Sequence, residues 1–225
     1  MIEVVLDTET TGLSVREGHR IVEIGCLELK NRIPTKNIFH YYLNPERKVS
    51  LEALKVHGYT DEFLSNQKKF EDIANEFLKF IEGKNLIIHN AGFDMSHLNN
   101  ELKLIGKKDL INTKVVDTLE IAREKFPGSQ ISLDALCKKF RIDNSKREKH
   151  SAIIDCELLA KVYINLIDEK EPLLDFSVEK NYENIKNKND VSKIKFSKIK
   201  IAPTEEEVSL HKAFLKKEIK KNFYN

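Results

Sequence analysis

Apolar residues along the first 170 or so positions fall into two patterns, short runs and helical spacings. The runs are short enough to be strands. They predict strands over residues 2–6, 21–29, 37–43, 86–88 and 115–117. The segment between the second and third runs contains Asn31 and Pro34 and predicts a turn. The first three strands should therefore form an antiparallel meander.

Helices are predicted between and after the later strands. Several place apolar residues three and four positions apart, the spacing of an amphipathic helix. The predicted helices span residues 70–81, 94–105, 132–140 and 151–166, with one more ending before Pro127. Ser132 is a plausible N-cap for the helix that it opens. Strands come first, and helices then alternate with short strands, so we expect an α/β fold with a mixed sheet flanked by helices.

The periodic pattern ends near residue 176. Residues 181–193 are polar and contain little core material, which is typical of a linker. Alternation over residues 194–201 then predicts a strand, and Thr204 with Glu207 forms a capping box for a helix that should reach about residue 222. A lone strand and helix bury little surface. This segment is therefore either a frayed tail or a docking segment for a partner.

These boundaries predict three parts: a domain over residues 1–176, a flexible linker over 177–193, and a C-terminal segment over 194–225. The charge is uneven among them, because 12 lysines and seven acidic residues lie beyond residue 176 in a chain of net charge +2. A basic tail can contact nucleic acid or a protein, and charge alone does not choose between them.

Composition narrows the cellular setting. No apolar run approaches the length of a membrane span, and the N-terminus begins with a strand pattern in place of a signal peptide. The three cysteines are widely spaced and fit neither a zinc pattern nor a disulfide framework. We therefore expect a cytoplasmic protein without membrane contact.

Candidate chemistry begins with Asp7 and Glu9 at the end of the first strand. The period of two places both carboxylates on one face of the strand, with Thr8 on the other. Gly12, a few residues on, permits a tight turn that could bring backbone amides to a nucleotide. A polar strand end making surface contacts is the plainer explanation of this pattern taken alone.

Three further residues join this pair. Asp94 follows a strand and should begin a helix, where an N-cap is its simplest role. His150 lies just before the last predicted helix, and Asp155 lies a little over one turn into it. Each residue has an ordinary structural explanation when taken singly. Their conjunction, at strand ends and helix starts beside one sheet, predicts a single cleft.

Clustered carboxylates indicate bound cations. Like charges repel and burial disfavours their ionisation, so a fold that gathers four of them usually does so around metal ions. Oxygen ligands suit Mg²⁺ or Mn²⁺. Two such ions, about 3.5–4 Å apart, can activate a water and stabilise the leaving oxygen in phosphodiester cleavage. A histidine adds a base that titrates near neutral pH.

In this order and spacing, the stretches 7–12, 89–94 and 150–155 resemble the three motifs of the DEDDh family of 3′→5′ exonucleases. Residues 52–63, and residues 132–137 with 142–147, also resemble segments of the proofreading (epsilon) subunits of bacterial DNA polymerase III. Other DEDDh nucleases lack these segments. The resemblance spans about residues 2–170. Ser151 departs from it, because glycine is common there; we expect one small residue to replace another without loss.

The resemblance implies a ribonuclease-H-like fold that binds two divalent ions, Mg²⁺ or Mn²⁺. It implies that His150 deprotonates the attacking water and that Glu52 and His57 contact the terminal nucleotide at the DNA 3′ end. The implied metal ligands are Asp7, Glu9, Asp94 and Asp155, and the implied substrate-binding residues are Asp7, Glu9, Glu52, His57 and Asp155. A mispaired terminus unpairs more easily and reaches the site more often, which explains proofreading without sequence reading.

The resemblance extends to the tail. It implies that the linker leads to a docking segment, residues 194–225, that binds the polymerase (alpha) subunit. Residues 171–176, Glu-Pro-Leu-Leu-Asp-Phe, resemble a degenerate sliding-clamp motif, Gln-x-x-Leu/Met-x-Phe, with Glu at the first position. The alternative is a helix end with Leu174 and Phe176 packed onto the domain.

Two other functions compete with proofreading. A DEDDh ribonuclease that trims RNA or short oligonucleotides would use the same chemistry, but the tail and residues 52–63 argue against it. A polymerase-bound scaffold with a silent nuclease is disfavoured because all five site residues are present. We therefore expect a 3′→5′ proofreading exonuclease that releases 5′-mononucleotides.

Overall fold

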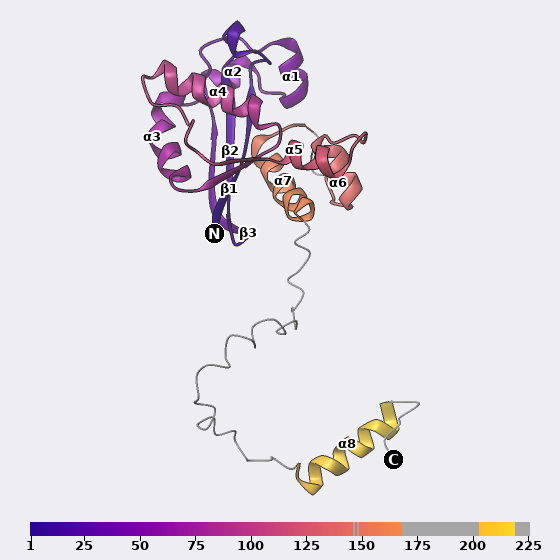
Figure 1. Ribbon diagram of the computed structural model, residues 1–225. Helices are drawn as coiled ribbons and strands as arrows, with labels where there is room; N and C mark the ends of the chain where they lie inside the picture. The colour runs from indigo at the N-terminus through magenta and orange to yellow at the C-terminus, as the bar shows by residue number, and fades with distance from the viewer. Residues whose placement is uncertain (146, 148, 168–202, 219–225) are drawn as a thin grey trace, which may run out of the picture. The chain divides into compact units, whose positions relative to one another are not determined.

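The computed structural model describes residues 1–145, 147, 149–167 and 203–218. Within them, five strands form one mixed sheet of order β3-β2-β1-β4-β5 (Figure 1). The strands are β1 (Ile2–Thr10), β2 (Ile21–Lys30), β3 (Ile33–Tyr42), β4 (Asn85–Ile88) and β5 (Val115–Asp117). The first three pair in antiparallel fashion, whereas β4 is parallel to β1 and β5 is parallel to β4. The predicted meander and mixed sheet are confirmed.

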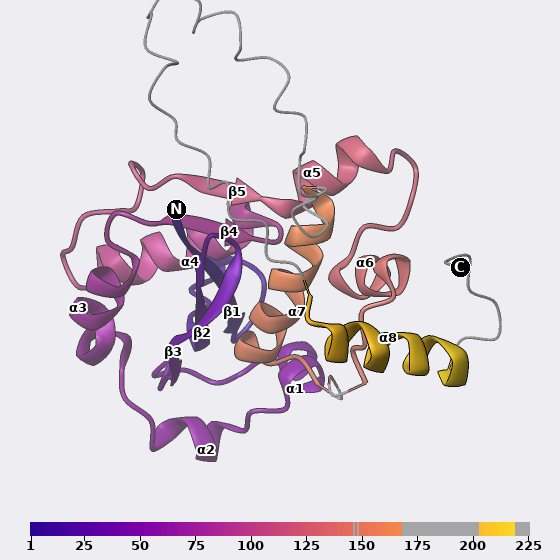
Figure 2. The same ribbon diagram turned by 90° about the horizontal axis from the view of Figure 1, so that it is seen from below.

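Helices cover both faces of this sheet, as predicted (Figure 2). One face carries α3 (Phe70–Ile81) and α4 (Ala91–Leu104). The other carries α5 (Thr118–Lys125), α6 (Leu133–Phe140) and α7 (Ala152–Leu166). Three short elements complete the unit: the 3₁₀ turn η1 (Val15–Glu17), α1 (Leu51–His57) and α2 (Asp61–Ser65). Ser132 caps α6 as expected, with its hydroxyl accepting the Ala135 N–H at 3.3 Å.

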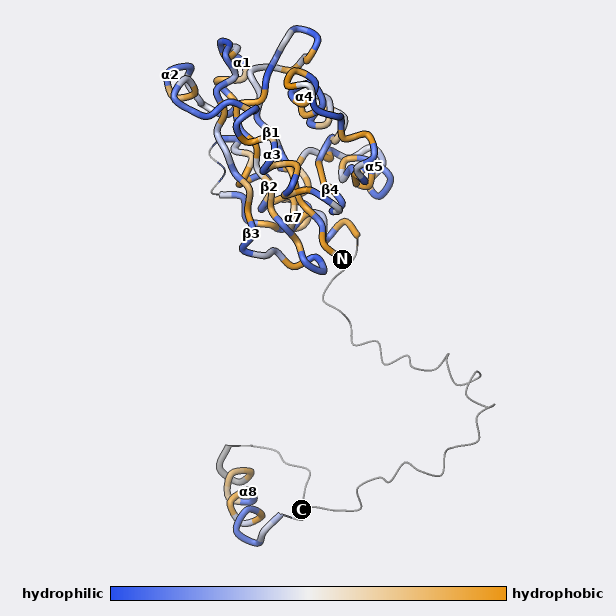
Figure 3. Tube along the Cα trace, turned by 90° about the vertical axis from the view of Figure 1, so that its left-hand side faces the viewer, coloured by the Kyte–Doolittle hydropathy of each residue, from blue (hydrophilic) through white to orange (hydrophobic). Residues whose placement is uncertain are grey.

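Alternate residues of the central strand enter two different cores. Val4 and Leu6 pack with the α3–α4 side, while Val5 packs with α7. Because β1 is buried on both faces, it appears in the sequence as a continuous apolar run. Figure 3 shows hydrophobic residues concentrated along the inner strands and α7. The same alternation continues to the end of β1, where it decides which way each polar side chain points.

The strands near the site differ from the prediction at their ends. β1 does not stop at Leu6 but stays paired with β2 as far as Thr10, with a register shift after Glu9. β3 begins four residues early and includes Pro34. Proline fits because β3 is the edge strand, where its missing N–H breaks no ladder bond. The turn is instead made by Asn31 and Arg32, both with positive φ.

The start of α4 also differs. The helix begins at Ala91, after Asn90 in the left-handed conformation, so Asp94 lies one turn inside and does not begin the helix. The cause is Asp117 at the end of β5, which accepts the backbone N–H groups of Asn90 and Ala91 at 3.0 and 2.9 Å. A carboxylate from a neighbouring strand thus supplies the cap.

Contacts divide the chain into two units, Met1–Leu173 and Leu174–Asn225. In the second, α8 (Glu205–Glu218) begins with the predicted capping box: the Thr204 N–H donates to Glu207 Oε2 at 2.8 Å, and the Glu207 N–H donates to Thr204 Oγ1 at 3.2 Å. The predicted linker, the strand over 194–201, the clamp-like residues 171–176 and the chain beyond 218 lie outside the described residues. Of the helices that are described, none has the length and apolar character needed to cross a membrane.

Candidate active site

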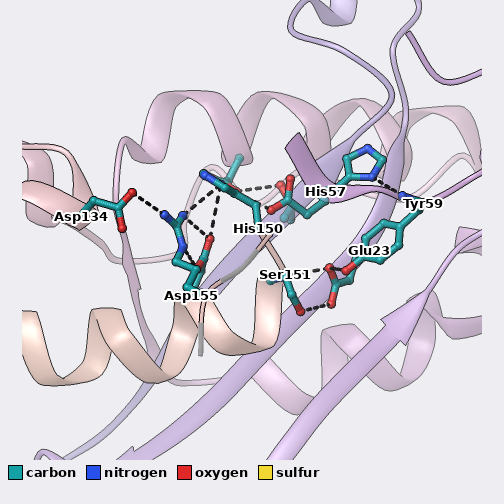
Figure 4. A network of polar contacts seen from close by, with 12 residues as sticks. Glu23, His57, Tyr59, Asp134, His150, Ser151 and Asp155 are labelled. Carbon is teal, nitrogen blue, oxygen red and sulfur yellow. Dashed lines mark hydrogen bonds and ion pairs between the residues drawn. The ribbon is translucent and has the colours of Figure 1, made fainter. Parts of the chain in front are cut away.

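The structure brings the five candidate residues of the three sequence stretches to one cavity of about 460 Å³ beside the end of β1. Asp7 and Glu9 belong to β1, Asp94 to α4 and Asp155 to α7, and His150 lies just before α7. Figure 4 shows the imidazole of His150 beside the carboxylate of Asp155. The Nδ1 atom of His150 lies 3.6 Å from Asp155 Oδ2 and 4.0 Å from Glu9 Oε1.

The position of Asp155 depends on a glycine in β2. A Cβ atom on Gly25 would lie 2.7–2.8 Å from the backbone of Ala152, so only glycine allows the first turn of α7 to rest on the strand. One turn further, the Cys156 Sγ lies 3.2 Å from the Gly25 carbonyl oxygen and 3.5 Å from that of Val5. This close packing brings Asp155 over β1 and β2.

Asp94 reaches the cavity from the opposite side of the sheet. Thr8 points away from Asp7 and Glu9, as the alternation predicts, toward the face that α4 covers. There its hydroxyl donates to Asp94 Oδ1 at 2.7 Å. The carboxylates therefore meet at the end of β1, reaching it from both faces of the sheet. The Thr8 hydroxyl fixes the position of Asp94, the carboxylate from α4.

Arg147, which sequence reasoning did not single out, binds on the α7 side of the cluster. Its NH2 group donates to Asp155 Oδ2 at 2.7 Å and lies 2.9 Å from His150 Nδ1, while its NH1 group donates to Asp134 Oδ2 at 2.8 Å (Figure 4). The guanidinium also binds the other Asp155 oxygen through Nε. A bidentate arginine of this kind supplies positive charge and orients both partners.

The remaining carboxylates are poorly compensated. Burial, followed by the charges of Asp155 and Glu23, raises the pKa of Glu9 to about 8. Burial also raises the pKa of Asp94 to about 7, although hydrogen bonds from Thr8 oppose it. The pKa of Asp7 is raised well above its usual range by desolvation and then by the charge of Asp94. Such shifts mark groups that lack a positive partner.

The pKa of His150 moves in the opposite direction. Burial lowers it first and the nearby Arg147 charge lowers it further, against the opposing effect of Asp155. Its side chain remains 45% exposed toward solvent. A half-exposed imidazole with a lowered pKa is neutral at physiological pH and able to accept a proton.

The donor set fits divalent cations. Carboxylate oxygens are the preferred ligands of Mg²⁺ and Mn²⁺, and ions between them would relieve the repulsion that raises these pKa values. Single ligand atoms of Glu9, His150 and Asp155 all lie within 4.8 Å of one another. The residues present can therefore hold such a group.

Glu52 and His57 line a second cavity of about 480 Å³, to which Glu9 also contributes. Glu52 is exposed on α1, and His57 is buried at its end. The His57 Nδ1 atom accepts the Tyr59 N–H at 3.0 Å, and the two rings stack with centroids 4.8 Å apart. These residues are therefore neighbours of the acidic cluster, because Glu9 lines both cavities.

Gly12, in the wall of the second cavity, lies against the His19 ring, and its expected role toward a nucleotide stays a prediction. A Cβ atom there would lie 2.3 Å from the His19 ring, so glycine is needed for close packing.

Glu23 was not identified from the sequence, although an acidic residue inside the apolar run of β2 was a visible signal. For Arg147 and Asp134, spacing gave no signal, because their contacts depend on the fold of the loop before α7.

A mixed sheet of this order, with carboxylates gathered at the end of its central strand, is a ribonuclease-H-like arrangement. The family model described as "Exonuclease" matches residues 4–163. Among solved structures, the chain is similar to the nuclease domain of 3′hExo, a DEDDh family member, with a TM-score of 0.65 at 18% identity over 75% of this chain and 92% of that one. This likeness establishes the fold.

Sequence relatives narrow the class. The chain is 46% identical over 219 residues to the DNA polymerase III subunit epsilon of Rickettsia felis, covering 95% of both chains. It is 42% identical over 224 residues to the subunit of that name from Escherichia coli, covering 95% of this chain and 91% of that protein. The chain belongs to the family of DNA polymerase III epsilon subunits. DEDDh exonucleases use divalent metal ions.

Proposed function

We propose that this chain is the 3′→5′ proofreading exonuclease of a replicative DNA polymerase, which removes mispaired 3′-terminal nucleotides. The observation that supports this most is the cavity where Asp7, Glu9, Asp94, Asp155 and His150 meet, within a chain whose relatives are epsilon subunits. Hydrolysis of the last phosphodiester releases a 5′-mononucleotide and leaves a new 3′-hydroxyl.

The four carboxylates are the proposed ligands of two divalent ions, Mg²⁺ or Mn²⁺. When bound, such ions activate a water and stabilise the leaving oxygen. The raised pKa values of Glu9, Asp94 and Asp7 support this assignment, because ligands deprotonate on binding a cation and the cluster lacks sufficient positive charge of its own. Arg147 pairs with both oxygens of Asp155 but makes no such pair with Glu9 or Asp94 among the described residues.

His150 is the proposed general base. Its exposed imidazole faces the cavity, and its lowered pKa keeps it ready to accept a proton from the attacking water. Asp155 lies 3.6 Å from Nδ1 and stabilises the imidazolium that forms. For Nε2 to accept that proton, Nδ1 has to carry the ring hydrogen toward Asp155 and give up its contact with the Arg147 NH2 group, which can only donate.

The second cavity is the proposed site for the terminal nucleotide. Glu52 at its rim offers a carboxylate to the 3′-hydroxyl, and His57 supports the sugar or base from below. Both are neighbours of Glu9, which lines both cavities. A nucleotide seated there would present its phosphate to the acidic cluster. A mispaired terminus frays more readily and so enters this cavity more often.

The C-terminal part of the chain is the proposed linker and binding segment for the polymerase. We propose that residues 1–176 form a self-sufficient nuclease, that 177–193 are a flexible linker, and that 194–225 bind the polymerase (alpha) subunit, with Phe196, Ile199, Ile201, Leu210, Phe214 and Leu215 as apolar contacts. On α8, Leu210 and Phe214 are 66% and 57% exposed and lie four residues apart, so they share one helix face. Exposed apolar groups so arranged commonly bind a partner's groove, and a linker keeps the nuclease near the primer end.

Residues 171–176 are a proposed contact for the sliding clamp, on the strength of their resemblance to its binding motif. Changing Leu174 and Phe176 to alanine should weaken binding to the clamp and leave nuclease activity unchanged. If clamp binding is the same in this variant, or is absent in the unaltered chain, the proposal is wrong.

Digestion assays test the function directly. The full chain with Mg²⁺ should remove the 3′ nucleotide from mispaired DNA faster than from paired DNA, and excess chelator should stop both reactions. RNA of the same sequence is the third substrate. Faster digestion of RNA than of mispaired DNA would favour a ribonuclease, and inactivity on all three, alone and with the polymerase subunit, would favour a scaffold.

Binding to the polymerase subunit tests the tail separately. A chain truncated after Phe176 should keep nuclease activity and lose binding. In the full chain, Leu210→Asp with Phe214→Asp should also abolish binding, whereas Ser209→Asp on the same exposed helix should not. Undiminished binding by the truncated chain would refute the docking assignment.

A further inference from the structure

Glu23 in β2 is fully buried and uses its whole hydrogen-bonding capacity. Oε1 lies 2.7 Å from His40 Nε2 and accepts the Ser151 hydroxyl at 3.0 Å. Oε2 accepts the Tyr59 hydroxyl at 2.7 Å and the Ala152 N–H at 2.9 Å. A carboxylate offers about four lone-pair sites, and here four donors face them. Glu23 is thus excluded as a further metal ligand, although Glu9 is its register partner on β1.

The donors come from three separate segments, and Figure 4 shows two of them, Tyr59 and Ser151, beside Glu23. His40 is in β3, Tyr59 follows α1, and Ser151 with Ala152 begins α7. The last two segments are those of the reaction: His150 precedes Ser151 directly, and Tyr59 stacks on His57. One buried carboxylate therefore joins the segment of the proposed base to the segment of the proposed nucleotide site.

A second contact joins the same two segments. The His150 N–H donates to the Val56 carbonyl oxygen in α1 at 3.2 Å. Glu23 holds Ser151 directly after His150, and it holds Tyr59 three residues after Val56. The His150 backbone is therefore fixed on both sides. The charge of Glu23 also lies at the N-terminal end of α7, where a helix favours an anion. Burial would raise the pKa of Glu23, but its hydrogen bonds outweigh burial and lower it.

We propose that Glu23 is a positioning residue of the exonuclease reaction, which holds His150 at the scissile phosphate and His57 at the terminal nucleotide in one fixed relation. This inference rests on the proposed function. Ser151 strengthens the link in this chain: its backbone is extended, at φ −146° and ψ 128°, and needs no glycine, while its hydroxyl adds a bond that glycine cannot make.

Two substitutions of Glu23 distinguish the effect of its negative charge from the effect of its size and hydrogen bonds. Glu23→Ala removes all four acceptor contacts, and misplacement of a catalytic group by about 1 Å lowers the rate on the order of 10²-fold. Glu23→Gln should stay within a few-fold of the unaltered chain. Its oxygen can face the Ala152 N–H and Tyr59, while its amide group donates to the Ser151 hydroxyl and faces His40.

Glu101→Ala is the matched control. Glu101 is another buried carboxylate, in α4, which accepts from Arg20 at 2.7 Å and from the Ile21 N–H at 3.2 Å at the start of β2. Its loss should destabilise the fold as much as Glu23→Ala does, with kcat and KM near those of the unaltered chain when assayed well below the unfolding temperature. Mn²⁺ binding should be unchanged in every variant.

Two smaller substitutions test separately the contacts of Glu23 with Ser151 and with Tyr59. Ser151→Ala should lower kcat a few-fold and leave KM unchanged, because it loosens only the His150 side. Tyr59→Phe keeps the ring on His57 but loses the hydroxyl, so it should raise KM a few-fold and leave kcat unchanged. Ser151→Ala and Tyr59→Phe are small changes that should fold even if Glu23→Ala does not.

The deciding experiment is a double-mutant cycle on the full chain with 3′-mispaired DNA and Mg²⁺. If Glu23 acts through His150, Glu23→Ala should lower kcat on the order of 10²-fold alone but hardly at all in a His150→Ala background. Equal loss in both backgrounds, or a kcat like that of Glu101→Ala, would overturn the proposal. An unaltered chain without metal-dependent activity would instead refute the proposed function.

Discussion

Glu9 and Glu23 are direct register partners on adjacent strands, yet the fold treats their carboxylates in opposite ways. Glu23 has four donors around it, which lower its pKa. Glu9 faces Asp155 and Glu23 itself, and its pKa is raised to about 8. Both are buried. The chain alone satisfies the first carboxylate, whereas the second requires positive charge from outside.

This difference separates a carboxylate that positions neighbouring residues from one that takes part in the reaction. A buried carboxylate that is fully hydrogen-bonded fixes the segments around it. A buried carboxylate that has only like charges around it destabilises the fold while no ligand is bound. Such groups are typical of functional sites, where a bound ligand relieves the repulsion. The acidic cluster is therefore the proposed cation site, and the Glu23 network is the proposed frame that positions residues around it.

The largest expected effect comes from removing one carboxylate of the cluster. Asp7→Asn should abolish nucleotide release, because losing several kcal/mol of charge stabilisation lowers the rate on the order of 10³-fold or more. Asp155→Ala should do the same. The fold of Asp7→Asn should remain intact, since removing a repelling charge leaves the packing unchanged, whereas Asp155→Ala also removes a partner of Arg147. Rates with Mg²⁺ and a circular dichroism spectrum check both points.

Glu28→Gln is the control, because Glu28 lies on β2 away from the cavity and pairs with Lys84 at 2.7 Å. It should keep full activity. An active Asp7→Asn enzyme would remove the acidic cluster from the mechanism.

The next effect concerns the base. His150→Ala should lose on the order of 10²–10⁴-fold in rate, while Mn²⁺ binding is largely kept because His150 is not assigned as a ligand. The matched control is His211→Ala, on exposed α8. A His150→Ala enzyme with the rate and pH profile of the unaltered chain would show that the water needs no such base.

A smaller effect should appear in stability without metal. The folded-state pKa values of Glu9 and Asp94 are raised to about 8 and 7. The folded chain therefore holds more protons than the unfolded chain above about pH 4, and the free energy of unfolding falls as pH rises through these values. Each pKa unit corresponds to about 1.4 kcal/mol, so a decline of several kcal/mol is expected between pH 5 and 8.

Denaturant unfolding with chelator measures this decline. Mn²⁺, or the Asp7→Asn substitution, should reduce it, whereas Glu101→Gln should not. Stability that is constant or rises over this range would contradict the account of the cluster as uncompensated.

The smallest effect is a shift in the pH dependence of the rate. Only neutral His150 accepts a proton, so the rate should rise with pH through the imidazole pKa, which burial and Arg147 lower. Arg147→Gln removes that positive charge and should move the rise to higher pH by a fraction of a unit. Lys149→Gln, the same charge change two residues on, should leave the profile in place. A shift to lower pH in Arg147→Gln would contradict the assigned effect of the guanidinium.

Much of the fold was predictable because its signals are local. The bounds of α3 and β5 match the prediction, since each depends on apolar spacing within the segment. The start of α4 was not predictable, because its cap comes from Asp117, distant in sequence. The short helices α1 and α2 were not predicted from periodicity either, since five to seven residues give too little pattern.

The site shows the same division. Asp7, Glu9, Asp94, His150 and Asp155 were identified by residue type and order, and the fold brings them together. The contacts that fix them were not identified. Glu23 binds Ser151 and Ala152 across 128 and 129 residues of sequence, and spacing contains no trace of such a contact. Chemistry could be inferred from composition, but positioning required the tertiary structure.

Counting bound Mn²⁺ by electron paramagnetic resonance tests the central comparison most directly. The unaltered chain should bind two ions, Asp7→Asn should lose at least one, and Glu23→Gln should still bind two. Two ions in Asp7→Asn, or a loss confined to Glu23→Gln, would contradict the claim that the cluster around Glu9 holds the cations and that Glu23 holds the frame.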